Sequence, residues 1–123
     1  MKFITIGELL MRLSPPDYEK IRTTSSYVVN FGGAEANVAV SLANLGVDTT
    51  VFTVLPDNDI GRSAVRSLKA NDVHTSPIIL GGERMGVYFL EEGIGVRSSK
   101  VIYDRKHSAF AEYDYTTVDF KAL

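Results

Sequence analysis

The sequence predicts an α/β fold, in which a mostly parallel sheet is flanked by helices and a second sheet is half exposed to solvent. Three observations lead to this prediction. Short apolar runs alternate with stretches of helical periodicity, an order typical of parallel strands joined by right-handed crossovers. Other stretches alternate apolar with polar residues, as strands with one solvated face do. The chain of 123 residues, 45% hydrophobic and 23% charged, has the composition of a folded domain.

The parallel strands and their helices are expected within the first 80 residues. The apolar run Phe3–Ile6 predicts a buried first strand that is closed by Gly7. Helical spacing begins at Glu35 and stops before Gly46, which stands where a helix-ending glycine is expected. A second buried strand is predicted over 49–54, and a third, short strand over 77–80, with Pro77 at its start or edge. In this first helix, Val38, Leu42 and Leu45 lie at helical spacing, and Ala36, Ala39 and Ala43 allow close packing against a sheet. A second helix is predicted after residues 57–59, and its inward-facing residues are Ile60, Ala64, Val65 and Leu68.

The alternating stretches predict the second sheet. Leu9, Met11 and Leu13 alternate with more polar neighbours, and residues 27–31 do the same before a glycine pair. Two longer stretches, 85–91 and 96–105, are joined around Gly93-Ile94-Gly95 and predict a β-hairpin. Residues 109–123 form a polar and aromatic stretch whose last residues have the pattern of the beginning of another element. Three core strands and two helices would leave the parallel sheet thin and poorly covered, so we expect an incomplete domain.

Composition excludes several classes of function. The net charge of −2 and the pI near 5.6 give no basic surface that would attract nucleic acid or an anionic membrane. The chain has no cysteine, which excludes disulfides, thiolate metal sites and a cysteine nucleophile. No apolar run approaches the roughly 18 residues of a membrane span. We therefore expect a cytoplasmic protein.

A glycine pair before the first helix is the first candidate binding site. Gly32 and Gly33 allow the backbone to approach a ligand closely, and the helix that follows presents its positive end at the same place. Asn37, in the first helical turn, could exchange hydrogen bonds with a hydroxyl group. The alternative is a simple glycine turn with a helix cap, and spacing alone favours neither interpretation.

Two residues at the end of the predicted hairpin form the second candidate. Tyr103 and Arg105 are two positions apart in a strand, so both side chains lie on one face, and Tyr88 on the other arm can join them. A guanidinium group beside a phenol suits an anionic ligand rich in oxygen, because arginine binds a carboxylate with two parallel hydrogen bonds. An exposed cross-strand pair without a ligand is the commoner arrangement.

Other motifs point to structure rather than chemistry. No phosphate-binding loop of the Walker type occurs, and no metal site is expected. Asp57-Asn58-Asp59-Ile60-Gly61 superficially resembles a calcium loop, but its spacing favours a helix cap from Asp57 or Asn58. His74 and His107 have no partner at ligand spacing and are expected at the surface.

The residues 32–39, 42–46 and 57–61 together resemble the N-terminal half of the ribokinase-like (PfkB) carbohydrate kinases. The resemblance covers essentially the whole chain. It implies one incomplete ribokinase-like domain over 1–123, with the core formed by 1–7, 32–80 and 107–123. It also implies an inserted β-sheet lid, whose strands lie within 8–31 and 84–106.

The glycine motif and the stretch Tyr103-Asp104-Arg105-Lys106-His107-Ser108-Ala109 are similar to the 2-keto-3-deoxygluconate kinases. The similarity implies a small sugar-acid substrate, contacted by Gly32, Gly33, Asn37, Tyr88, Tyr103 and Arg105. It implies ATP and Mg²⁺ as cofactors of the full-length enzyme, with neither bound by this segment alone. The catalytic aspartate of the family lies in a Gly-Ala-Gly-Asp motif that these residues lack. A homodimer formed through the lid sheet is a further implication of the resemblance.

Two other functions stay open. One is a ribokinase- or fructokinase-type enzyme for a neutral sugar, although Leu9, Leu10 and Met11 occupy the neighbourhood in which such enzymes carry an aspartate. The other is a sugar-binding module without catalytic activity, which would fold alone and bind its ligand without ATP. The exposed core of an incomplete domain disfavours this second possibility.

Overall fold

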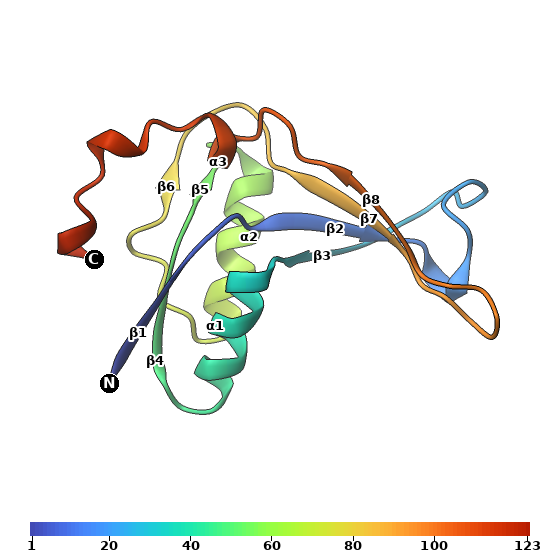
Figure 1. Ribbon diagram of the computed structural model, residues 1–123, viewed down its shortest axis with the longest axis horizontal. Coiled ribbons are helices and arrows are strands. Elements are labelled where there is room, and N and C mark those ends of the chain that lie inside the picture. The colour runs from blue at the N-terminus through green and yellow to red at the C-terminus, as the bar shows by residue number, and fades with distance from the viewer.

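The computed structural model describes residues 1–123 and has two parts, a core of parallel strands with two helices and a four-stranded sheet that extends away from it (Figure 1). The core strands pair in parallel, with Ile4 opposite Thr50 and Val54 opposite Ile79. This arrangement confirms the predicted α/β class and the parallel core. The core strands are β1 (Lys2–Ile6), β4 (Asp48–Phe52), β5 (Val54–Leu55) and β6 (Ile79–Leu80).

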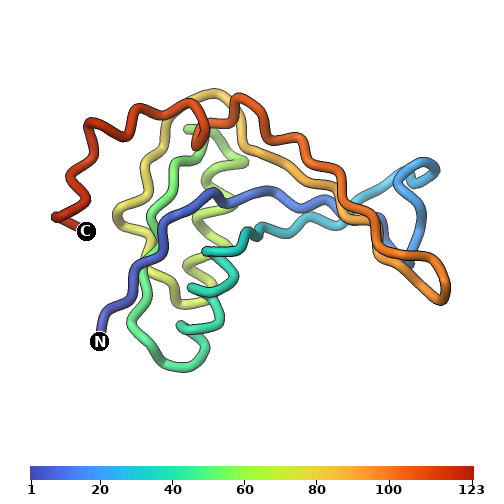
Figure 2. The backbone as a smooth tube through the Cα atoms, viewed as in Figure 1, coloured from blue at the N-terminus to red at the C-terminus, as the bar shows by residue number.

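The second part, called the projecting sheet below, has the strand order β3-β2-β7-β8. Strands β7 and β8 form the predicted hairpin, and β7 also runs parallel to β2. The sheet ends at the two loops 15–27 and 92–99, far from the core (Figure 2). Three of its strands lie within 8–31 and 84–106, and β3 ends one residue beyond, at Gly32; the role of this sheet as a lid stays a prediction. They are β2 (Leu10–Ser14), β3 (Val28–Gly32), β7 (Val87–Glu91) and β8 (Lys100–Asp104).

Local signals explain where the two long helices begin and end. α1 (Ala34–Asn44) is followed by Gly46 just past its end, as predicted; the φ of +85° suits glycine, and the Gly46 N–H donates to the Ala43 carbonyl. α2 (Asp59–Ala70) begins where the Asn58 side chain accepts a hydrogen bond of 3.0 Å from the Gly61 N–H. The residues 57–61 therefore form a helix cap, as predicted. The remaining helical turns are α3 (Ala109–Glu112) and the 3₁₀ turns Pro16–Tyr18, Tyr115–Thr117 and Phe120–Ala122.

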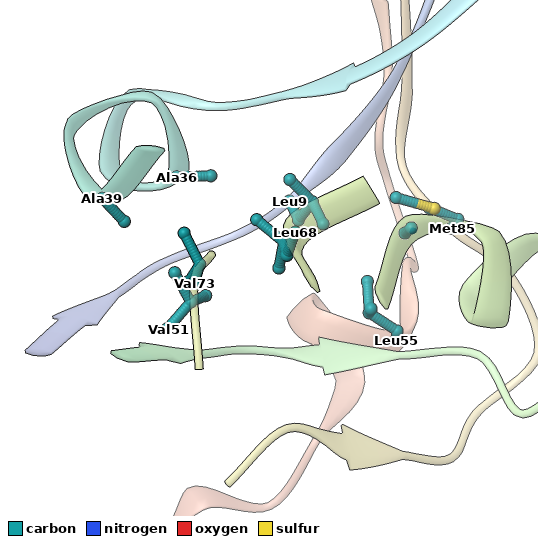
Figure 3. Close-up of a cluster of buried hydrophobic side chains, with 9 residues drawn as sticks. Leu9, Ala36, Ala39, Val51, Leu55, Leu68, Val73 and Met85 are labelled. Atoms are coloured by element: carbon teal, nitrogen blue, oxygen red, sulfur yellow. The ribbon is translucent and has the colours of Figure 1, made fainter. Parts of the chain in front are cut away.

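The hydrophobic core lies between the two long helices and the parallel strands (Figure 3). α1 faces it with Ala36 and Ala39, because small side chains allow the helix to approach the sheet closely. The helical spacing of Val38 and Leu45 was a misleading signal, since both are exposed. The prediction that Ile60 faces inward is also wrong. The buried cluster consists of Leu9, Ala36, Ala39, Val51, Leu55, Ala64, Leu68, Val73 and Met85.

The first strand is less buried than its sequence predicts. Thr5 is buried, but Phe3 and Ile6 are 40% and 48% exposed. Within residues 1–123, β1 pairs with a strand on one side only, which is β4. The apolar run is therefore correct as a strand and wrong as a fully covered one. A membrane-spanning helix would have to be longer and more apolar than any helix in this structure.

Candidate functional site

A cavity of about 570 Å³ lies where the core meets the projecting sheet. Its walls come from the end of β1, the start of α1, strands β7 and β8, and α3. This volume is within the range of roughly 300–1,000 Å³ that is usual for small-molecule sites. Five of the six residues predicted to bind a ligand line it, namely Gly33, Asn37, Tyr88, Tyr103 and Arg105. The other lining residues are Ile6, Gly7, Glu8, Leu10, Ala34, Glu35, Val101 and Phe110.

The sixth predicted residue, Gly32, is buried behind this lining. A methyl group placed on Gly32 would lie 3.4 Å from both the Asn37 Oδ1 and the Tyr88 hydroxyl oxygen. These two side chains come from different parts of the molecule and converge at this point. Gly32 therefore lies beneath the meeting place of two candidate ligand-binding groups rather than facing the cavity itself.

Gly33 is required by close packing. A methyl group placed there would lie 2.5 Å from the backbone carbonyl oxygen of Glu8, closer than real side chains approach. Gly33 is also the residue before α1, and no side chain caps that end of the helix. Backbone N–H groups at a helix start are orphan donors with a positive potential. Because Gly33, Ala34 and Glu35 line the cavity, this helix end is available to oxygen atoms of a ligand.

The tyrosine and arginine side chains lie on one face of the projecting sheet, as predicted. Tyr88 and Tyr103 are opposite each other on β7 and β8, with ring centroids 5.9 Å apart. The Arg105 guanidinium carbon lies 5.8 Å from the centre of the Tyr103 ring, within the range of a cation–π contact. Two phenol groups and one cation thus line a single wall of the cavity.

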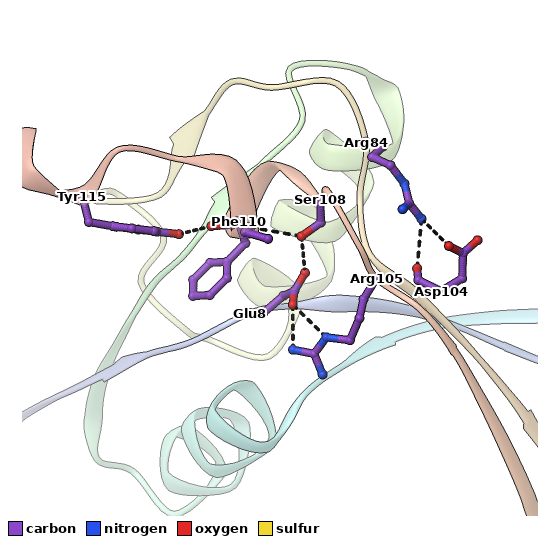
Figure 4. A network of polar contacts seen from close by, with 8 residues as sticks. Glu8, Arg84, Asp104, Arg105, Ser108, Phe110 and Tyr115 are labelled. Carbon is purple, nitrogen blue, oxygen red and sulfur yellow. Dashed lines mark hydrogen bonds and ion pairs between the residues drawn. The ribbon is translucent and has the colours of Figure 1, made fainter.

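Glu8 is the site residue that the sequence did not reveal (Figure 4). Its side chain is only 7% exposed. One carboxylate oxygen accepts hydrogen bonds from Arg105, at 3.1 Å from Nε and 2.7 Å from Nη2, and the other accepts one of 2.7 Å from the Ser108 hydroxyl. Arg105 and Ser108 are 97 and 100 residues away along the chain, and no local pattern indicates these contacts.

Arg84 holds the backbone on both sides of Arg105. Its guanidinium donates to the Asp104 carbonyl oxygen at 2.9 Å, to the Asp104 carboxylate at 3.0 Å and to the Lys106 carbonyl oxygen. Figure 4 shows Arg84 and Glu8 on opposite sides of the segment that carries Asp104 and Arg105. Arg105 is consequently fixed twice, through its backbone neighbours by Arg84 and through its side chain by Glu8.

A tyrosine supports the remaining wall of the cavity. The Tyr115 hydroxyl donates to the carbonyl oxygen of Phe110, which lines the cavity, and the two rings lie 5.6 Å apart. Burial raises the pKa of the Tyr115 phenol, and the negative charge of Glu8 raises it further. The protonated phenol is the form that keeps this hydrogen bond.

The charges in the cavity do not form an excess of positive charge. Glu8 and Glu35 contribute two carboxylates and Arg105 contributes one guanidinium. The structure contains no group of three or more His, Cys, Asp or Glu side chains that could hold a metal ion. His74 and His107 are exposed, as predicted, and contact Asp48 and Glu112 respectively. Arg105 is therefore the cationic group that can meet an anionic ligand in this cavity.

Comparison with known proteins decides the family. The pattern of the pfkB family carbohydrate kinases matches residues 2–120. This chain belongs to that family. A 2-dehydro-3-deoxygalactonokinase of Haloferax volcanii is 37% identical over 108 residues, which are 88% of this chain and 34% of that protein. As a member of the pfkB family, the chain spans about a third of the length of this relative.

Solved structures place the same family fold over nearly the whole chain. A 2-dehydro-3-deoxygluconokinase from Thermotoga maritima matches 99% of this chain and 37% of its own, with 48% identity and a TM-score of 0.96. An uncharacterized sugar kinase from Pyrococcus horikoshii, solved in complex with ATP, shares the fold at 22% identity with a TM-score of 0.84, over 98% of this chain and 39% of its own. The ribokinase-like fold expected from the sequence is confirmed.

Proposed function

We propose that this chain is the sugar-binding part of an ATP-dependent kinase that phosphorylates 2-keto-3-deoxygluconate to its 6-phosphate. The observation that carries the proposal is the placement of Arg105, whose guanidinium lies in the cavity between the Tyr103 ring and the Glu8 carboxylate. An arginine that is fixed in this way offers its remaining N–H groups to the carboxylate of a sugar acid. The names of the relatives from Haloferax volcanii and Thermotoga maritima support the same substrate class.

The other residues of the cavity suit the hydroxyl groups of such a substrate. Asn37 and the start of α1 offer an amide and backbone N–H groups from the core. Tyr88 and Tyr103 offer hydroxyl groups and apolar ring faces from the projecting sheet. Sugars have alternating polar and apolar surfaces, so this mixture of donors and rings fits them.

ATP and Mg²⁺ are proposed to bind outside residues 1–123. The chain contains no glycine-rich phosphate loop of the Walker type and no cluster of metal ligands. When bound, ATP supplies the phosphoryl group and Mg²⁺ neutralises its charge. The residues described above bind and orient the sugar, and none of them is assigned a chemical step.

A substrate panel on the full-length enzyme tests this function. ADP release is measured with 2-keto-3-deoxygluconate, 2-keto-3-deoxygalactonate, fructose and ribose. We expect kcat/KM to be highest for the two keto acids. A higher kcat/KM for fructose or ribose would contradict the proposal and favour the neutral-sugar alternative. The galactonate epimer is included because the Haloferax volcanii relative is named for it.

We also propose a homodimer, formed through the face of the projecting sheet that points away from the cavity. Leu13, Val29, Phe89 and Ile102 form one row across all four strands, on the face opposite Tyr88 and Tyr103. Val29 and Ile102 are 52% and 45% exposed. Apolar side chains in a row on an uncovered sheet suit a second copy of the same surface. Sedimentation of the full-length protein as a monomer at all concentrations would contradict this proposal.

A further inference from the structure

We propose that Glu8 is a positioning residue that sets Arg105 in the orientation needed to bind the carboxylate of the substrate. The inference deepens the proposed function and rests on it. Glu8 itself is not proposed to act on the reacting atoms. Its effect passes through the arginine that it holds.

The first argument is the number of bonds that Glu8 makes. Both of its carboxylate oxygens are used, one by two N–H groups of Arg105 and the other by the Ser108 hydroxyl. The side chain is nearly buried, at 7% exposure, so solvent competes little for these bonds. Hydrogen bonds between charged groups are stronger than neutral ones, particularly where water is excluded. The orientation of the guanidinium plane is therefore fixed by Glu8.

The second argument concerns what remains free on Arg105. A guanidinium carries five N–H groups. Glu8 accepts from the N–H of Nε and from one N–H of Nη2, which leaves the second N–H of Nη2 and both of Nη1 at the free end of the guanidinium. The Arg105 side chain is 47% exposed and lines the cavity. With Glu8 on the opposite edge, this free end is the part of Arg105 that is held in position for a ligand carboxylate.

The third argument is that all four chain connections between the core and the projecting sheet meet at Glu8. Glu8 belongs to the connection from β1 to β2, and Arg105 and Ser108 to the connection from β8 to α3. The other two connections contribute Gly33 and Gly86. A methyl group would lie 2.5 Å from the Glu8 carbonyl oxygen at Gly33 and 2.7 Å from a Glu8 carboxylate oxygen at Gly86. Both glycines leave the space that Glu8 occupies.

If Glu8 acted only through its negative charge, its removal would strengthen substrate binding instead of weakening it. Glu8 and Glu35 place two negative charges in a cavity that is proposed to bind an anion. Removing either charge would then strengthen binding of the keto acid. Positioning predicts the reverse for Glu8. Glu35 provides the matched control, because it lines the same cavity and forms no hydrogen bond or ion pair with another side chain.

The experiment measures kcat and KM of the full-length enzyme for 2-keto-3-deoxygluconate and for a neutral analogue in which a hydroxymethyl group replaces the carboxylate. Three variants are compared with the wild type: Glu8→Ala, Glu8→Gln and Glu35→Gln. We expect Glu8→Ala to raise KM for the keto acid about tenfold, the effect of losing one charge-assisted contact. The change in KM for the neutral analogue should be less than about twofold, as should the change in kcat.

Glu8→Gln is the conservative variant. It keeps an oxygen that can accept from Arg105, so KM for the keto acid should rise by a smaller factor than in Glu8→Ala. Glu35→Gln should lower that KM, because it removes a negative charge from the cavity that is proposed to bind an anion. If Glu8→Ala does not fold, as judged by circular dichroism, Glu8→Gln carries the test alone.

Three results would overturn the inference. A KM for the keto acid that is unchanged or lowered in the Glu8 variants would show that charge, not position, is the contribution of Glu8. An equal rise in KM for the keto acid and for the neutral analogue would show a general structural role. A wild-type enzyme without activity on keto acids would overturn the proposed function itself, and the inference with it.

Discussion

The buried segment 49–55 and the connection 105–108 are held in place in different ways. Every residue from 49 to 55 is buried, and apolar packing against neighbouring elements fixes the segment. In the connection, only Ser108 is buried, and polar contacts from Glu8 and Arg84 fix the chain. The first region spreads its stability over many contacts. The second depends on two side chains, one of which comes from the far end of the sequence.

This difference has a consequence for mutations. A substitution in the segment 49–55 should lower the stability of the fold and leave ligand recognition intact. A substitution in or around the connection 105–108 should do the reverse. The two regions can therefore be separated by measuring unfolding and KM on the same set of variants.

The largest effect on stability is expected for Leu55→Ala in the segment 49–55. Leu55 is 1% exposed and belongs to the buried cluster. Removing its methyl groups should lower the free energy of unfolding by about 2–5 kcal/mol, measured by denaturant titration of the full-length protein. Leu45→Ala is the control, because Leu45 is 79% exposed. Equal losses in the two variants would contradict the position of the core.

A smaller effect is expected at the start of α2. Asn58→Ala removes the hydrogen bond from the Gly61 N–H to the Asn58 side chain. The loss of this cap should lower the free energy of unfolding by about 1 kcal/mol. Asn58→Asp, which keeps an acceptor oxygen and places a negative charge at the helix start, should retain most of the stability. A loss as large in Asn58→Asp as in Asn58→Ala would exclude the capping role.

The smallest effect is a dependence of stability on alkaline pH. The pKa of Tyr115 is raised above its ordinary value of 10.0, so the fold favours the protonated phenol. Its stabilising contribution is complete below pH 10 and is lost as the pH rises through the raised pKa. Above pH 10, the free energy of unfolding should therefore fall less steeply in Tyr115→Phe than in the wild type. Parallel curves for the two proteins would contradict this expectation.

The sequence predicts the parts of the molecule that local patterns specify. The order of strands and helices, the glycine that ends α1 and the Asn58 cap all follow from short-range rules. The exposure of Val38 and Ile60 does not, because it depends on which face of each helix the sheet covers. A helix that packs closely uses alanines as its buried face, and a hydrophobicity pattern gives them little weight.

The residues of the candidate site also divide into those that local patterns predict and those that depend on contacts between distant parts of the chain. Tyr103 and Arg105 could be placed together because strand geometry puts alternate residues on one face. Their common cavity with Gly33 and Asn37 was implied by a family resemblance rather than by spacing. Glu8 could not be found in either way. A single carboxylate after a glycine gives no local signal, and its partners are about a hundred residues away.

The most direct test of the central claim is the effect of Arg105→Ala on substrate preference. In the full-length enzyme, KM is measured for 2-keto-3-deoxygluconate and for the neutral hydroxymethyl analogue. Loss of a two-pronged contact with a carboxylate should raise KM for the keto acid about a hundredfold and leave KM for the analogue within about threefold. An equal change for both compounds would remove Arg105 from carboxylate recognition and contradict the assignment of this cavity to a sugar acid.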